Sequence, residues 1–209
     1  MDANGVVRDL LRLFFTQTEK DELWETALTL ESLGSRLAIP SLVKALYDNN
    51  PHRRHAAARA LGWIPHAGRA AAIPLVKVLV DRSQPQPVRE EAAESLAYLG
   101  YTRAAPALIS VLDEPDVPIR FWAVFALGSL GRSIGASEHH KQVVVQALER
   151  MIEDAEVPPG NWWSVGREAL AMLGALTPQY RPILETEIAA ILKNPDAPPE
   201  SRRWAESYS

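Results

Sequence analysis

Apolar residues recur along this chain in paired stripes that repeat every 32 to 34 residues. Three segments share nearly the same pattern: LAIPSLVKALYDNNPHRRHAAARALGWIP, AAIPLVKVLVDRSQPQPVREEAAESLAYLG and AAPALISVLDEPDVPIRFWAVFALGSLG. Aligning them brings Pro40, Pro74 and Pro106 into register, with separations of 34 and 32 residues. A repeat of this length indicates a solenoid, in which each unit buries its apolar face against its neighbours.

Each repeat predicts two short helices joined by a turn. The proline stands at the start of the first helix, where its missing N–H would have no intrahelical partner. The second helix carries Ala and Leu four residues apart, which places both side chains on one face. The Ala and Leu positions are Ala57 and Leu61, Ala92 and Leu96, and Ala123 and Leu127. Because neither amphipathic helix can bury its apolar face alone, the repeats are expected to stack.

Weaker copies flank the three repeats, and together they predict a single domain over residues 1–209. We expect an N-terminal capping unit over residues 1–35, three well-matched repeats over 37–132, a degenerate repeat over 140–175 and a C-terminal cap over 176–209. The corresponding residues Leu127 and Leu170 lie 43 positions apart, so the extra residues fall in loops. The predicted fold is all-α, an α-solenoid of about five helical hairpins.

The repeat resembles those of the HEAT-repeat superfamily, particularly the short HEAT-like repeats of the phycobilisome (PBS) lyase type. The resemblance rests on the helix AIPxLxxxL, an Asp before the turn, an Arg that opens the next helix, and the motif AxxALGxLG. It covers residues 37–131 well and the rest loosely. It implies an armadillo-like superhelix. It leaves the function open, because the superfamily includes scaffolds, chromophore lyases, a hydroxylase and DNA-repair enzymes.

Composition and charge narrow the classes of partner. The 209 residues include 22 basic and 26 acidic side chains, for a net charge of −4, so no cationic excess favours nucleic-acid binding. Cysteine is absent, which excludes disulfides, thiolate metal ligands and cysteine nucleophiles. No apolar run approaches the ~18 to 20 residues that a membrane span requires. We therefore expect a soluble cytoplasmic protein that binds neither membrane nor nucleic acid.

Charged residues that recur in register form two columns across the repeats. In the repeats that this chain resembles, such residues hydrogen-bond to backbone groups at turns and helix ends, so we expect a structural role for both columns. The columns are Asp48, Asp81 and Asp113, and Arg54, Arg89 and Arg120.

The positions where the repeats differ form the candidate partner-binding surface. They lie one, two and five residues after the column arginine and are expected to face away from the Ala and Leu stripe. They hold His55, Ala56 and Arg59 in the first repeat, Glu90, Glu91 and Glu94 in the second, and Phe121, Trp122 and Phe125 in the third. Tyr98, Trp162 and Trp163 would extend the surface. An exposed aromatic ridge is typical of a binding surface, whereas a 133–141 loop folded over it would make it core.

Neither metal nor covalent chemistry is indicated by the remaining residues. Iron-binding members of the superfamily carry His-Glu dipeptides at helix starts, and no His-Glu dipeptide occurs among the five histidines of this chain. The hydroxylase interpretation is set aside on that ground, and no metal or cofactor is expected. A phosphate loop and a GxSxG elbow are also absent. Arg167 and Glu168, in the helix of the degenerate repeat, are expected to be solvated.

These observations favour a non-catalytic scaffold or adaptor that binds another protein on the concave face of the solenoid. Two alternatives stay open. A phycobilin lyase-like or chaperone-like protein would bind a bilin or a phycobiliprotein, with His55 and Arg59 meeting the propionates. A DNA-glycosylase-like HEAT enzyme is the remote alternative, which the scattered basic residues disfavour.

Overall fold

The computed structural model describes residues 3–33, 36–64, 67–133 and 136–208. Within these ranges every regular element is helical, with twelve α-helices, three short 3₁₀ helices and no strand. The predicted all-α class is therefore confirmed. Contacts between residues divide the chain into two compact units, Met1–Ser110 and Val111–Ser209, and each is described by itself.

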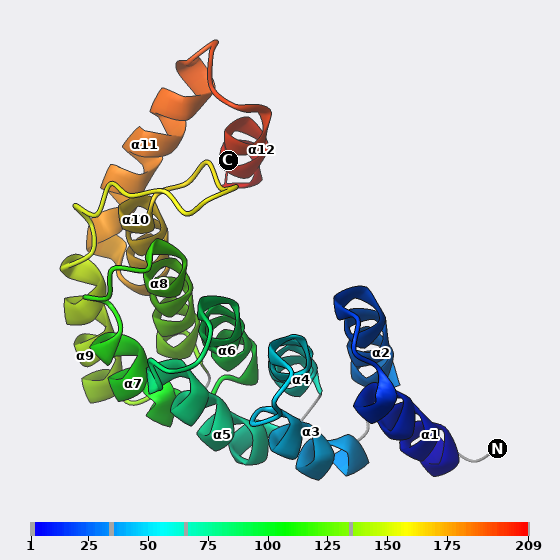
Figure 1. Cartoon of the computed structure of the whole chain (residues 1–209). Coiled ribbons are helices and arrows are strands. Elements are labelled where there is room, and N and C mark those ends of the chain that lie inside the picture. The colour runs from blue at the N-terminus through cyan, green and yellow to red at the C-terminus, as the bar shows by residue number, and fades with distance from the viewer. Residues whose placement is uncertain (1–2, 34–35, 65–66, 134–135, 209) are drawn as a thin grey trace. The chain divides into compact units, whose positions relative to one another are not determined.

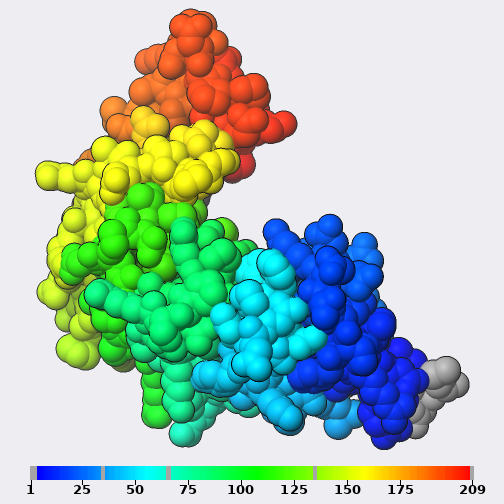
Figure 2. Space-filling model, in the orientation of Figure 1, coloured from blue at the N-terminus to red at the C-terminus, as the bar shows by residue number. Residues whose placement is uncertain are grey.

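Unit 1 is built from two layers of helices (Figure 1). Its helices are α1 (Ala3–Thr16), α2 (Lys20–Leu33), α3 (Ile39–Ala45), α4 (Pro51–Trp63), α5 (Gly68–Val80), α6 (Gln86–Leu99) and α7 (Ala105–Ser110), with 3₁₀ turns at Arg36–Ala38 and Thr102–Ala104. The helices α2, α4 and α6 lie side by side in one layer, and α3, α5 and α7 follow one another in the other. In the space-filling view the side chains of α2 and α4 are in contact (Figure 2).

Local sequence explains where α4 and α6 begin and end. The Asn50 side chain accepts a hydrogen bond from the backbone N–H of His52 at 2.9 Å and caps α4, and Pro51 follows at the first helical position. Gly100 ends α6 with a φ of 61°, in the left-handed region that favours glycine.

The close approach of α4 and α6 sets the distance between these two helices in the layer formed by α2, α4 and α6. A Cβ atom added to Gly62 would lie 2.2 Å from Ser95 Oγ, so only glycine fits there without displacement. The Ser95 hydroxyl also donates a hydrogen bond across the interface to the Ala58 carbonyl at 3.0 Å. The flanking Leu61 and Leu96 are fully buried, which makes this contact the centre of the core of unit 1.

The column arginines each reach back to the end of the preceding helix or the turn after it. In unit 1, Arg54 donates to the Asp48 carbonyl at 2.8 Å and Arg89 donates to the Leu79 carbonyl at 2.8 Å. In unit 2, Arg120 donates to the Glu114 carbonyl at 2.7 Å. These bonds supply partners to carbonyl groups that a helix end leaves without one. The Asp81 side chain accepts from the Ser83 N–H at 3.0 Å, and Asp113 pairs with Arg150 at 3.0 Å.

Unit 2 packs its helices around α10. Its helices are α8 (Val117–Gly131), α9 (Glu138–Glu149), α10 (Val165–Leu176), α11 (Arg181–Lys193) and α12 (Pro199–Tyr208), with a 3₁₀ turn at Pro178–Tyr180. The helices α8, α9 and α11 all contact α10, and α12 packs against α11. A Cβ atom at Gly128 of α8 would lie 2.3 Å from Met172 Sδ of α10, so these two helices also approach closely.

Replacing Gly62 with alanine is expected to destabilise unit 1. The new methyl group would force Ser95 and α6 to shift, and overpacking of this kind costs about 1 to 3 kcal/mol of unfolding free energy. Chemical denaturation followed by circular dichroism measures the change. The control is Glu25→Ala, at an exposed position of α2, which we expect to change stability by no more than about 0.5 kcal/mol. Equal stability of the two variants would contradict the close packing of α4 on α6.

Candidate functional site

The helices α2, α4 and α6 of unit 1 each carry one stripe of aromatic and charged side chains. On α4 the stripe residues are spaced by four, and on α6 they are spaced by three and four, so each set lies on one helix face. On α2 the two stripe residues lie two turns apart. We call the eight residues the aromatic–carboxylate cluster: Trp24 and Glu31 from α2, His55, Arg59 and Trp63 from α4, and Glu91, Glu94 and Tyr98 from α6.

Arg59 lies at the centre of the cluster. Its guanidinium carbon is 4.4 Å from the centroid of the Trp63 ring and 5.5 Å from that of Trp24. Its Nε is 3.6 Å from Glu31 Oε2, and its Nη1 is 3.7 Å from Glu94 Oε1. Both N–O separations exceed the length of an N–H···O hydrogen bond. Charge and ring stacking therefore hold the guanidinium in this place.

Two further contacts close the cluster on either side of Arg59. The His55 imidazole stacks on the Trp24 ring with centroids 5.2 Å apart and an interplanar angle of 21°. Its Nε2 lies 3.3 Å from Glu91 Oε2. At the other end of the α4 stripe, Trp63 meets Tyr98 with ring centroids 4.0 Å apart. All three helices are thus joined through these side chains.

Burial and like charge perturb the acids of the cluster. Burial raises the pKa of Glu94 to about 7, and the Glu91 carboxylate adds to this shift, while Arg59 acts against it. Burial is also the main cause that raises the pKa of Tyr98. At neutral pH Glu94 is therefore close to half-protonated. A carboxyl group in this state readily accepts or releases a proton when a charge arrives nearby.

Several buried polar atoms in the cluster have no hydrogen-bond partner among the described residues. They are the donors Arg59 Nε and Trp63 Nε1 and the acceptors Glu31 Oε2 and Glu91 Oε1. The Glu91 side chain is only 6% exposed. Unpaired buried polar groups cost free energy in a folded protein, and a ligand that supplied the missing bonds would recover that cost.

The sequence placed five of the eight cluster residues in the partner-binding set: His55, Arg59, Glu91, Glu94 and Tyr98. Glu90 is half-buried beside them on α6, and its charge adds to the raised pKa of Glu94. Trp63 was missed, although it lies nine residues after its column arginine, as Tyr98 does. Trp24 and Glu31 were missed because the repeat pattern is weak at the N-terminal cap.

The predicted aromatic ridge belongs to unit 2, where its rings form a row. Phe121 meets Trp122 edge to face with centroids 5.7 Å apart, and Trp122 meets Phe125 at 5.6 Å. The prediction that all three face water is wrong for Phe121, which is 9% exposed and belongs to the core. Trp122 and Phe125 are half-buried. Part of the 133–141 loop lies outside the described residues, so its relation to the ridge stays untested.

The prediction that Trp163 extends an open surface is also wrong. Trp163 is 4% exposed because Trp204 of α12 covers it, with ring centroids 4.0 Å apart. Trp162 is half-buried and contacts both rings. The neighbouring Glu168, expected to be solvated, is 8% exposed, and burial raises its pKa to about 7.

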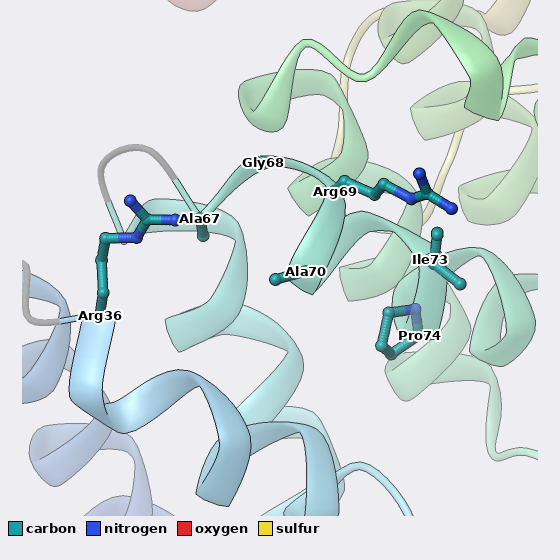
Figure 3. A pocket seen from close by; sticks show the side chains of 7 residues that line it. All are labelled: Arg36, Ala67, Gly68, Arg69, Ala70, Ile73 and Pro74. Atoms are coloured by element: carbon teal, nitrogen blue, oxygen red, sulfur yellow. The ribbon is translucent and has the colours of Figure 1, made fainter.

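A hollow of about 610 Å³ near the start of α5 is a weaker candidate site (Figure 3). Its walls include Arg36 and Arg69, both exposed, and the Pro74 ring. The two guanidinium groups do not point toward one another, so they offer no shared anion site. The hollow contains none of the cluster residues.

The residues that the structure describes do not form a metal centre. No group of three or more His, Asp or Glu side chains in these ranges is arranged to hold a metal ion, and His66 lies outside them. Within the described ranges the side chains therefore offer no ligand set of the kind that an iron ion requires. Among the same residues, no helix is both long and apolar enough to span a membrane.

Comparison with known proteins places this architecture in a family. A family model described as HEAT repeats matches residues 7–97 and 74–161. This chain belongs to the HEAT-repeat family. The resemblance inferred from the repeats is therefore confirmed. The structure is also similar to a chain in the complex of CpcE and CpcF of the phycocyanin lyase from Nostoc. The TM-score is 0.70 at 23% identity, and the match covers 95% of this chain and 74% of that chain. That likeness shows the HEAT-like fold alone.

Sequence relatives of this HEAT-repeat chain are named as enzymes. It is 26% identical to the deoxyhypusine hydroxylase of Schizosaccharomyces pombe over 156 residues, which cover 74% of this chain and 48% of that protein. It is 33% identical to the deoxyhypusine hydroxylase of Drosophila melanogaster over 106 residues, which cover 51% of this chain and 34% of that protein. The chain thus spans about half the length, or less, of the curated relatives that it matches.

These relatives overturn two expectations drawn from the sequence. The non-catalytic scaffold is contradicted, as is the expectation that the chain is not an enzyme, because the matched relatives are hydroxylases. The missing His-Glu dipeptides led to the error. The missing dipeptides indicate only that one set of metal ligands is absent. The similarity to the hydroxylases lies in the repeat sequence as a whole, which does not depend on those dipeptides.

Stability is expected to fall as pH rises through the range set by the two buried glutamates. Their pKa values rise from 4.5 in the unfolded chain to about 7 in the folded one. Between these two pKa values the folded state binds more protons than the unfolded state. The contribution of the two glutamates to stability is therefore full below pH 4.5 and is lost as the pH rises toward 7. Glu94→Gln should flatten this decline in part, and adding Glu168→Gln should flatten it further.

Urea denaturation at several pH values between 4.5 and 8 measures this dependence. Glu25→Gln, at an exposed position of α2, is the matched control and should follow the wild-type curve. A Glu94→Gln variant with the same pH dependence as the wild type would show that Glu94 is not perturbed.

Proposed function

We propose that this chain binds substrate within an enzyme similar to the deoxyhypusine hydroxylases, and that the aromatic–carboxylate cluster holds a positively charged group of that substrate. One observation carries the proposal. Three carboxyl groups, those of Glu31, Glu91 and Glu94, gather with the rings of Trp24 and Trp63 in the cluster, whose eight residues include one permanently charged cation, Arg59. Carboxylates and aromatic faces both attract ammonium and guanidinium groups.

Each part of the cluster has a role in this proposal. The faces of Trp24 and Trp63 contact the cation, and Glu31 and Glu91 accept hydrogen bonds from it through oxygens that have no hydrogen-bond partner among the described residues. His55 orients Glu91 through its Nε2 contact. Glu94 is ionised when a cation binds and takes up a proton when the cation leaves, because its pKa lies near 7 with Arg59 beside it.

Support for an enzymatic context comes from the curated relatives, whose names describe hydroxylases that act on deoxyhypusine. The proposal assigns substrate binding and proton exchange to this chain. It assigns no metal-dependent step, because the described residues offer no metal-binding group. The activity of the full-length relatives is not transferred, since the chain spans about half of their length or less.

Isothermal titration calorimetry with n-butylammonium chloride and with free deoxyhypusine tests the proposal. The wild type should bind both, and Glu91→Gln combined with Glu94→Gln should weaken binding at least tenfold, since charged hydrogen bonds contribute about 1.5 to 3 kcal/mol each. The matched control is Glu168→Gln, which removes a buried glutamate of unit 2 and should leave the affinity unchanged. Wild-type protein that binds neither compound, or a double variant with wild-type affinity, would refute the proposal. Neutral n-butanol should not bind.

The affinity for n-butylammonium is further expected to rise as pH increases from 6 to 8. Glu94 must lose its proton to face the cation, and its pKa with Arg59 beside it is about 7. Titrations in buffers of different ionisation enthalpy should show net proton release on binding near pH 7. In Glu94→Gln the release should disappear, and its persistence there would place the released proton on another group.

A further inference from the structure

Arg59 already fills the place that the proposed substrate cation would take. Its guanidinium lies 4.4 Å from the Trp63 ring and 5.5 Å from the Trp24 ring, with Glu31 and Glu94 on its sides. Its side chain is 19% exposed, so it is half-buried among these residues. The aromatic faces and two of the three carboxyl groups are therefore engaged by a cation of the chain itself.

Fewer hydrogen bonds hold Arg59 than hold the buried arginines Arg53 and Arg120. Arg53, six residues earlier on α4, donates to the Phe14 carbonyl at 3.2 Å and to Asp48 at 2.8 Å. Arg120 donates to the Glu114 carbonyl at 2.7 Å and to Asp154 at 2.9 Å. Arg59 instead approaches its two carboxylates at 3.6 and 3.7 Å, and its Nε has no hydrogen-bond partner in the described residues. A buried charge held in this way recovers little of its lost hydration.

We infer that Arg59 is a displaceable internal occupant of the cluster, and that it selects ligands by the number of N–H donors they carry. This inference rests on the proposed function, in which the cluster binds a substrate cation. An incoming group must replace the stacking and the ion pairs that Arg59 provides. It gains over Arg59 by donating hydrogen bonds to Glu31 Oε2, which Arg59 approaches only to 3.6 Å, and to Glu91 Oε1; both oxygens lack a hydrogen-bond partner among the described residues.

Selection by N–H donors follows from this competition. A primary ammonium or a guanidinium group has several N–H donors and can pair with both acceptors while it stacks on tryptophan. A quaternary ammonium stacks on tryptophan equally well but has no donor, so it gains nothing over Arg59. The wild-type site is therefore expected to bind n-butylammonium and to exclude tetramethylammonium. Once Arg59 is removed, the site should accept both cations.

Arg59→Met tests this selection, because methionine keeps an unbranched apolar side chain and removes the charge. We expect its affinity for tetramethylammonium to exceed that of the wild type by about tenfold or more, the range of a cation–π contact plus an ion pair. The gain for n-butylammonium should be smaller. Arg59→Lys retains a cation and should remain selective, and it serves as a second variant if the methionine variant does not fold. Binding is measured by calorimetry and by tryptophan fluorescence.

The matched control is Arg167→Met in unit 2. The Arg167 guanidinium also lies over a tryptophan ring, that of Trp163 at 5.7 Å, and its Nε is 3.6 Å from Glu187, so the same kind of contact is removed elsewhere. This control should show wild-type affinities for both cations. In the wild-type protein, the NMR signal of the Arg59 side-chain N–H should shift when n-butylammonium is added, because the group leaves the Trp63 ring.

The outcomes separate the inference from the proposed function. If the wild type binds n-butylammonium, Arg59→Met has the same two affinities as the wild type and the Arg59 N–H signal does not move, the inference is overturned and the proposed function stands. A loss of affinity in folded Arg59→Met also overturns it, since Arg59 would then be part of the binding surface. If no variant binds any cation, both the inference and the proposed function are wrong.

Discussion

The close approach of α4 to α6 is the constraint on which the cluster depends. At Gly62 a single added carbon would lie 2.2 Å from Ser95 Oγ, so the two helices are too close at this point for any side chain larger than that of glycine. At this spacing the ring centroids of Trp63 and Tyr98 lie 4.0 Å apart, and Arg59 lies beside Glu94. A wider packing would separate these stripes and admit water between the carboxylates, and the environment that raises the pKa of Glu94 would be lost.

The repeat itself explains how a site arises on this layer. In stacked helical hairpins, corresponding positions of successive helices lie next to each other, so a site needs one suitable residue per repeat. Trp63 and Tyr98 both stand nine residues after a column arginine and meet in space. Likewise Arg59 and Glu94 both stand five residues after one, and they form an ion pair. The differences between repeats thus assemble the cluster, while the shared Ala and Leu positions build the core.

The sequence predicts the helical repeat and most of the cluster residues on α4 and α6, because strong local periodicity determines both. It does not predict the burial of Phe121, Trp163 or Glu168, which depends on how other helices pack over them. For Trp163 the covering side chain is Trp204, which lies 41 residues further along the chain in a helix that carries no repeat signature. Trp24 and Glu31 were missed for a related reason, since the first helical pair departs from the repeat pattern. The relation to hydroxylases was missed because a motif for metal binding was treated as a mark of descent.

The central claim is that the aromatic–carboxylate cluster of unit 1 is a cation site that Arg59 occupies until a ligand enters. A crystal structure of the wild-type chain soaked with n-butylammonium tests this most directly. Our account predicts the ligand nitrogen between the Trp24 and Trp63 rings, within hydrogen-bond distance of Glu31 and Glu91, with the Arg59 guanidinium turned away from Trp63. A structure in which Arg59 keeps its place on Trp63 at saturating ligand, and the ammonium group is bound elsewhere or not at all, would contradict it.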